Sequence, residues 1–167
     1  MLADLIKQTR QNHALEHATV SLLLERGIRP PLGGYSTGGG FFILGKASTE
    51  GIAQAAEEAL DRLLEGQREL AVSPHCGTNL VTGAILAGVV SAIILGRSKG
   101  RLQGVPAVAV GIIGATLVSR PLGNALQRRY TTLADVGNME IAAVTRLWYG
   151  QLGAYTIHRV RTRFSAD

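Results

Sequence analysis

Hydrophobic positions in the first 66 residues follow two different periods. Residues 3–26 predict a helix, which Gly27 is placed to end. Its leucines recur at roughly helical intervals: Leu5, Leu15, Leu22 and Leu23. The segment STEGIAQAAEEALDRLLEGQ predicts a second helix, capped at Ser48 or Thr49 and ended at Gly66. Between the helices, YSTGGGFFILGKA is short, aromatic and apolar, and its run of glycines predicts a strand pair or a strand with a flexible turn.

Two uncharged runs follow, at residues 77–96 and 102–119, and the basic segment RSKGR joins them. A membrane-spanning helix needs about 20 mostly apolar residues, so two such runs with a short loop predict a transmembrane hairpin. A pair of buried core helices is the alternative, but a chain this small has little other surface with which to cover them. Small residues recur at four-residue spacing and favour close helix packing: Gly83, Ala87 and Ser91, then Ala107, Gly111 and Ala115.

The last part of the chain turns basic again. TTLADVGNMEIAAVTRLWYG predicts a loop that leads into a helix beginning near Asn138. The tail AYTIHRVRTRF alternates apolar and basic residues and predicts an edge strand or a basic strip on lipid headgroups, with His158 at the surface.

These elements together indicate a mainly α membrane protein with a small α+β domain at the membrane surface and a two-helix transmembrane hairpin. We expect the surface domain to span residues 1–76, the hairpin residues 77–122, and a returning C-terminal segment residues 123–167.

Composition narrows the classes of partner. The net charge is +5, the sequence pI is about 9.9 and the mean hydropathy is +0.18, which fits contact with anionic lipid headgroups. No basic platform with interleaved aromatic residues stands out, so we expect no nucleic acid as a partner. The single cysteine, Cys76, cannot form an intrachain disulfide.

Candidate chemistry begins at NHALEHATV, residues 12–20, which holds two of the four histidines. Residues four apart lie on one face of a helix, so His13 and His17 can reach a single cation. Glu16 lies beside them and can take a proton from a water bound to that cation. The pattern H-x-x-E-H is the inverzincin signature, although a match of three residues arises often by chance.

A third protein ligand is needed to complete a catalytic zinc site. A hairpin that crosses the membrane and returns leaves His75, Cys76 and Glu140 on the same side as the two histidines. We expect Glu140 to be the third ligand, with His75 as its competitor.

The segments HALEHATV, SPHCGTNL and TTLADVGNMEIAA occur in this order, the second immediately before an apolar span. This arrangement resembles the YqhQ-like family of uncharacterised bacterial membrane proteins. The resemblance implies that the three segments form one site, with Glu140 at the position of the family's glutamate, and it implies no particular activity.

The leading hypothesis is an integral membrane, metal-dependent hydrolase, a zinc metallopeptidase. His13, His17 and Glu140 would bind the metal, Glu16 would be the general base, and His75 or Asn79 would stabilise the oxyanion. The strand around residues 41–44 would pair with an extended substrate, a peptide or a membrane protein.

We expect the protein in the bacterial inner membrane. The absence of a cleavable signal favours a cytoplasmic site domain. The basic residues give no clear orientation, because RSKGR favours the hairpin loop in the cytoplasm, whereas Arg120, Arg128 and Arg129 favour the opposite side. The alternatives are a non-catalytic metal- or cofactor-binding subunit of a membrane complex and a structural membrane protein. The protein could also form a homo-oligomer.

Overall fold

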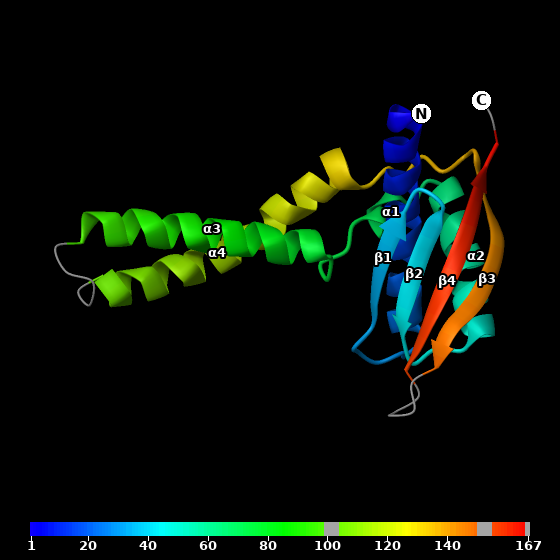
Figure 1. Cartoon of the computed structure of the whole chain (residues 1–167), viewed down its shortest axis with the longest axis horizontal. Coiled ribbons are helices and arrows are strands. Elements are labelled where there is room, and N and C mark those ends of the chain that lie inside the picture. The colour runs from blue at the N-terminus through cyan, green and yellow to red at the C-terminus, as the bar shows by residue number, and fades with distance from the viewer. Residues whose placement is uncertain (99–103, 150–154, 166–167) are drawn as a thin grey trace. The chain divides into compact units, whose positions relative to one another are not determined.

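A computed structural model describes residues 1–98, 104–149 and 155–165 of the chain (Figure 1). The chain forms two compact units. One comprises Met1–Ser73 together with Arg128–Asp167, and the other comprises Pro74–Gln127. The described residues are mainly helical, with one small antiparallel sheet.

The first unit carries the sheet and two long helices. In chain order its elements are α1 (Leu2–Glu25), β1 (Gly33–Thr37), β2 (Gly40–Gly45), α2 (Thr49–Leu64) and a 3₁₀ turn, η1 (Arg68–Ala71). A π turn, η3 (Gln127–Thr131), then leads to β3 (Met139–Tyr149) and β4 (Thr156–Phe164). The predicted first helix, strand pair and second helix are confirmed. Ser48 caps α2, because its Oγ accepts a hydrogen bond from the Gly51 amide at 3.0 Å.

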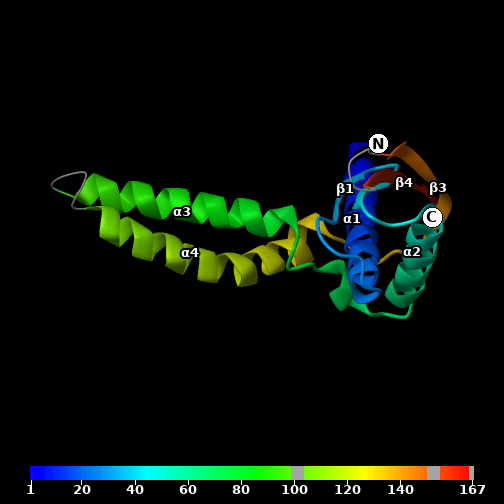
Figure 2. The same cartoon turned by 90° about the horizontal axis from the view of Figure 1, so that it is seen from below.

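The four strands have the order β1-β2-β4-β3, and every neighbouring pair is antiparallel. Both helices lie on one face of the sheet, α1 against β1 and β2 and α2 against β3 and β4 (Figure 2). The core between sheet and helices is apolar and almost fully buried, and its largest fully buried apolar side chains are Phe41, Leu15, Leu22, Leu23, Ile43 and Ile52.

The prediction of a helix beginning near Asn138 is wrong, because this segment forms the edge strand β3. Its register with β4 shifts twice, between Ile141 and Ala143 and again between Arg146 and Trp148. Each β-bulge adds a residue and interrupts the alternation of faces, so the core-facing, partly buried positions Ile141 and Val144 fall three apart. That interval imitates helical periodicity.

The predicted edge position of the C-terminal tail is also wrong. β4 lies between β2 and β3, and β2 lies between β1 and β4, so both are interior strands. Residues 41–44 already pair with two neighbours and cannot accept a substrate as an added strand.

The second unit contains α3 (Gly77–Arg97) and α4 (Val105–Leu126), which pack against each other. Both helices are long and apolar enough to cross a membrane. The predicted close packing through small residues is found. A Cβ on Gly83 would lie 3.2 Å from the Ser119 Cβ, and one on Gly111 would lie 2.5 Å from the Val90 Cγ1. α4 continues through Pro121 to Leu126, beyond the predicted end of the span.

Gly111→Leu is expected to separate the two helices, because a side chain at this position collides with Val90 and Ile94. Gly114→Leu in the same helix is the matched control, since nothing lies within 4 Å of a Cβ there. Thermal unfolding of the detergent-solubilised chain should show a clearly lower midpoint for Gly111→Leu and an unchanged midpoint for Gly114→Leu. Equal midpoints for the two variants would contradict this packing.

Candidate metal centre

The inner face of α1 is unusually polar for a helix that covers a core. Gln11 and Asn12 are at most 1% exposed, Glu16 is 6% exposed and His17 is 3% exposed. Buried polar groups are costly unless they are hydrogen-bonded, so each of these side chains constrains the segment that it contacts. The resulting contacts gather the candidate site around α1.

His13 and His17 lie one helical turn apart, and their ring centroids are 4.3 Å apart. His13 Nδ1 is 2.9 Å from the Thr131 carbonyl oxygen, and His17 Nδ1 is 2.9 Å from that of Ala71. Because a carbonyl only accepts, each Nδ1 carries the ring proton, and each Nε2 carries the lone pair that a metal requires. Backbone carbonyls therefore set both rings in the tautomer of a metal ligand.

Glu16 is held on the neighbouring side of α1. Its Oε2 accepts a hydrogen bond from the Ser36 hydroxyl of β1. β1 passes close to this carboxylate because Gly34 has no side chain: a Cβ there would lie 2.5 Å from Glu16 Oε1. The carboxylate is thus buried and oriented by β1, and it lies on the same helix as the histidine pair, next to His17 in the sequence.

Sequence reasoning missed two further residues of α1, Arg10 and Gln11. Arg10 Nη2 donates to the carbonyls of Arg129 and Thr132, at 3.1 and 3.2 Å. Gln11 Nε2 donates to the Asp135 carbonyl at 2.6 Å. These bonds fix the segment that follows η3 along α1. The only signal in the sequence was their position next to the H-x-x-E-H motif.

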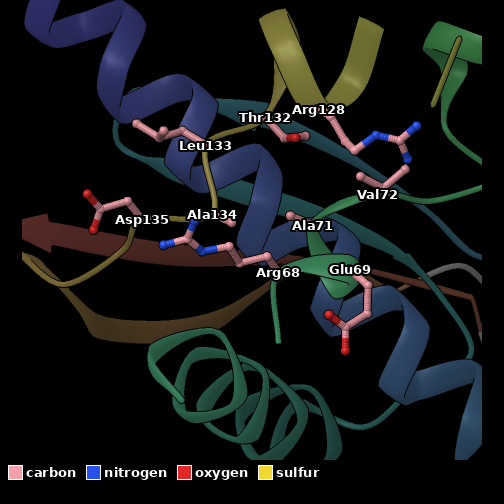
Figure 3. Close-up of a pocket in the computed structure, with 9 residues that line it drawn as sticks. All are labelled: Arg68, Glu69, Ala71, Val72, Arg128, Thr132, Leu133, Ala134 and Asp135. Carbon is pink, nitrogen blue, oxygen red and sulfur yellow. The ribbon is translucent and has the colours of Figure 1, made fainter. Parts of the chain in front are cut away.

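A cavity of about 740 Å³ opens beside this assembly. Its walls come from η1 with Val72 and from the segment 128–135, and these two segments also supply the carbonyls that hold the histidines (Figure 3). In Figure 3, Arg68 extends towards Asp135, while Arg128 lies over Val72. The lining is apolar at Ala71, Val72, Leu133 and Ala134.

Glu140 does not belong with the histidines. It is exposed at the start of β3, in register with Arg163, and the group of potential ligands does not include it. The prediction placed it in a helix that entered the site; in a strand, its side chain points to the opposite face from its core-facing neighbours Met139 and Ile141. We therefore do not retain Glu140 as the third ligand.

The other predicted site residues, His75, Cys76 and Asn79, belong to the second unit. Asn79 Nδ2 donates to the Pro74 carbonyl at 3.1 Å and to Asn124 Oδ1 at 3.2 Å. Both amide hydrogens thus have acceptors within that unit, so we assign Asn79 no part in stabilising an oxyanion.

Cys76 caps α3, and its Sγ accepts from the Thr78 amide at 3.4 Å. Within the first unit, His13 and His17 supply two imidazole donors, and imidazole nitrogen is a common ligand of zinc.

The expectation that His158 lies at the surface is wrong, because its side chain is only 1% exposed. Its Nε2 is 3.0 Å from Thr49 Oγ1, and its Nδ1 has no hydrogen-bond partner among the described residues. Burial lowers the pKa of His158, and the positive charge of Arg146 lowers it further. His158 is a neutral core residue on β4.

Comparison with known sequences identifies the family. Residues 8–144 match DUF6391, a domain of unknown function. The chain belongs to this family. An uncharacterised protein of Picosynechococcus sp. is 35% identical over 133 residues, which cover 74% of this chain and 65% of that relative. The chain therefore spans less than two thirds of the relative's length. No solved structure matches it.

Lowering the pH below about 6.5 is expected to destabilise the first unit through His158. Its pKa in the folded state is below the unfolded value, so the unfolded chain binds a proton first. The free energy of unfolding therefore falls as the pH drops through the unfolded pKa. Urea unfolding between pH 8 and 5 should show a smaller loss for His158→Gln, whose amide can still reach Thr49. An identical pH dependence in both proteins would contradict this assignment.

Proposed function

We propose that this DUF6391 protein is an integral membrane, metal-dependent hydrolase of the zinc metallopeptidase type. The observation that carries the proposal is the geometry on α1. Two histidines one turn apart would present their Nε2 atoms as ligands, because backbone carbonyls hold both Nδ1 atoms, and the same helix carries a buried carboxylate, Glu16. The resemblance to the YqhQ-like membrane proteins supports a membrane protein.

The two apolar helices support a location in a bilayer, for which we propose the bacterial inner membrane. Among the residues of each span's most apolar window, 11% are buried within the protein. A soluble protein would expose a large apolar surface there, which a bilayer removes from water. The antiparallel hairpin returns the chain to its starting side, so both parts of the first unit lie on one side, proposed to be the cytoplasm.

We propose Cys76 as the third ligand, with His75, its neighbour in the sequence, as the alternative. The Ala71 carbonyl orients His17, and Cys76 follows five residues later in the chain. Five extended residues reach at most about 17 Å, so this thiol is tethered near the histidines by the backbone itself. Three protein ligands leave a fourth position of zinc open for water or substrate.

Glu16 would act as the general base. Bound zinc would lower the pKa of a water molecule and polarise a substrate carbonyl. Ser36 donates to one oxygen of the Glu16 carboxylate and so fixes its rotamer. The neighbouring cavity would bind the substrate, a peptide or a segment of a membrane protein, through its apolar wall and its two arginines, Arg68 and Arg128.

A non-catalytic metal site is the second candidate. The adjacent pair His75-Cys76 offers two donors rather than one, and with His13 and His17 it would make a set of four. Four protein ligands close a zinc site and leave no position for water. Activity of the purified protein separates this candidate from the first.

Metal content of the detergent-purified chain tests the site. We expect close to one zinc per chain, lost in His13→Ala and His17→Ala and weakened in Cys76→Ala, because each removes a ligand. Glu16→Gln and Glu140→Gln should retain the metal, and Glu140→Gln is the control for removing an acidic residue. A native chain without metal after purification free of chelators would overturn the proposal.

Peptide hydrolysis then tests catalysis. Against a library of unstructured peptides, Glu16→Gln should lower turnover by about 10²- to 10⁴-fold, because a general base typically contributes that much. Gly34→Ala should lower turnover as well with zinc retained, since its methyl group displaces the Glu16 carboxylate; Gly33→Ala, with open space around it, is its control. A native protein that holds zinc and hydrolyses nothing would favour the closed, non-catalytic site.

A further inference from the structure

The face of the sheet turned away from α1 and α2 is not covered by any described element of the first unit (Figure 1). Side chains on this open face alternate with core residues along each strand. The register places three arginines of β4, one aromatic residue each from β1 and β2, and residues along β3 on it: Tyr35, Phe42, Leu44, Glu140, Thr145, Trp148, Ile157, Arg159, Arg161 and Arg163.

Two aromatic rings and an arginine form one row across the centre of the open face. Tyr35 pairs with Phe42, and Phe42 pairs with Arg159 on the next strand. Tyr35 is 70% exposed, and the Arg159 guanidinium lies 5.7 Å from the centre of the Phe42 ring. Aromatic side chains on neighbouring strands of an open sheet face can serve as a surface on which nucleic-acid bases stack.

The arginines form a second row, along β4. Arg159, Arg161 and Arg163 are two residues apart, so their Cα atoms are separated by about 6.7 Å along the strand. This interval is comparable with that between successive phosphates of an extended single strand. Arg161 and Arg163 are exposed, and Glu140 is the acidic residue opposite Arg163. The open face is therefore positively charged and periodic.

We propose that this open face binds a single-stranded nucleic acid, with bases stacked on Tyr35 and Phe42 and phosphates on the arginines of β4. Charge complementarity favours this occupant over a second copy of the chain, whose arginines would face these ones. The linear sequence did not reveal the platform, because rings and arginines come from strands more than 100 residues apart.

Trp148 provides the measurement. It is the only tryptophan of the chain, is 53% exposed and lies on the open face in register with Ile157. Titration of the detergent-purified full chain with a 12-nucleotide oligothymidylate or oligouridylate should quench its fluorescence saturably. With three phosphates bound, log K against log salt should have a slope of about −2.

Four variants sharpen the test. Tyr35→Ala should weaken binding roughly 5- to 150-fold, through the loss of one stacked base. Arg161→Gln should reduce the salt slope by about 0.7. Glu140→Gln should tighten binding, because it removes the one acidic side chain of the face, and a misfolded variant would not show this gain. Arg62→Gln, which neutralises an arginine of α2 behind the sheet, is the control and should change nothing.

Absence of saturable quenching in the native chain would overturn the proposal, as would unchanged affinity in Tyr35→Ala and Arg161→Gln. A response of Trp148 to anionic phosphatidylglycerol vesicles or to polyglutamate, without a response to the oligonucleotides, would also overturn it and assign the face to that other class of partner. Zinc content of the same variants stays at the native level, so failure here is separable from failure of the metal site.

Discussion

The buried polar face of α1 is the constraint on which the first unit depends. A helix that buries glutamine, asparagine, glutamate and histidine must find hydrogen-bond partners for all of them, and the partners lie in distant parts of the chain. Ala71, just before the hairpin, accepts from His17, and Thr131, just after it, accepts from His13. Asp135 accepts from Gln11. The same hydrogen bonds that satisfy the buried polar groups of α1 also hold the two segments that line the cavity close to the histidines.

This arrangement gives the histidines two roles that are hard to separate. Their Nδ1 atoms donate to backbone carbonyls and so hold the fold, while their Nε2 atoms are the proposed metal ligands. Removing either ring therefore leaves a carbonyl without its donor and also removes a proposed ligand. Glu16 is different, because glutamine at that position keeps an oxygen that can accept from Ser36 while the negative charge is removed. For this reason Glu16 reports on chemistry more cleanly than either histidine does.

Helices, the strand pair and the apolar hairpin could be predicted from local pattern, because each has its own period and its own end signals. Glu140 and His158 could not be placed. Two β-bulges gave the core-facing residues of β3 a helix-like spacing. In β4, apolar residues alternate with arginines, a pattern that is typical of a solvent-exposed edge strand. Whether a strand lies inside a sheet depends on partners far away in sequence. The histidine pair was predictable because a helical motif carries its geometry within five residues, whereas the contacts of Arg10 and Gln11 run to segments more than 115 residues away.

β4 is the last strand of the chain, yet it lies between β2 and β3. A ribosome makes α1, β1, β2 and α2 first, then both apolar helices, and only afterwards the strand that joins the two halves of the sheet. The half-sheet of β1 and β2 must wait, with one side of β2 unpaired, while the hairpin is synthesised. Pairing of β4 with β2 and β3 can therefore begin only after the apolar hairpin has been made, and the wall that residues 128–135 give to the pocket beside α1 is likewise completed late in synthesis.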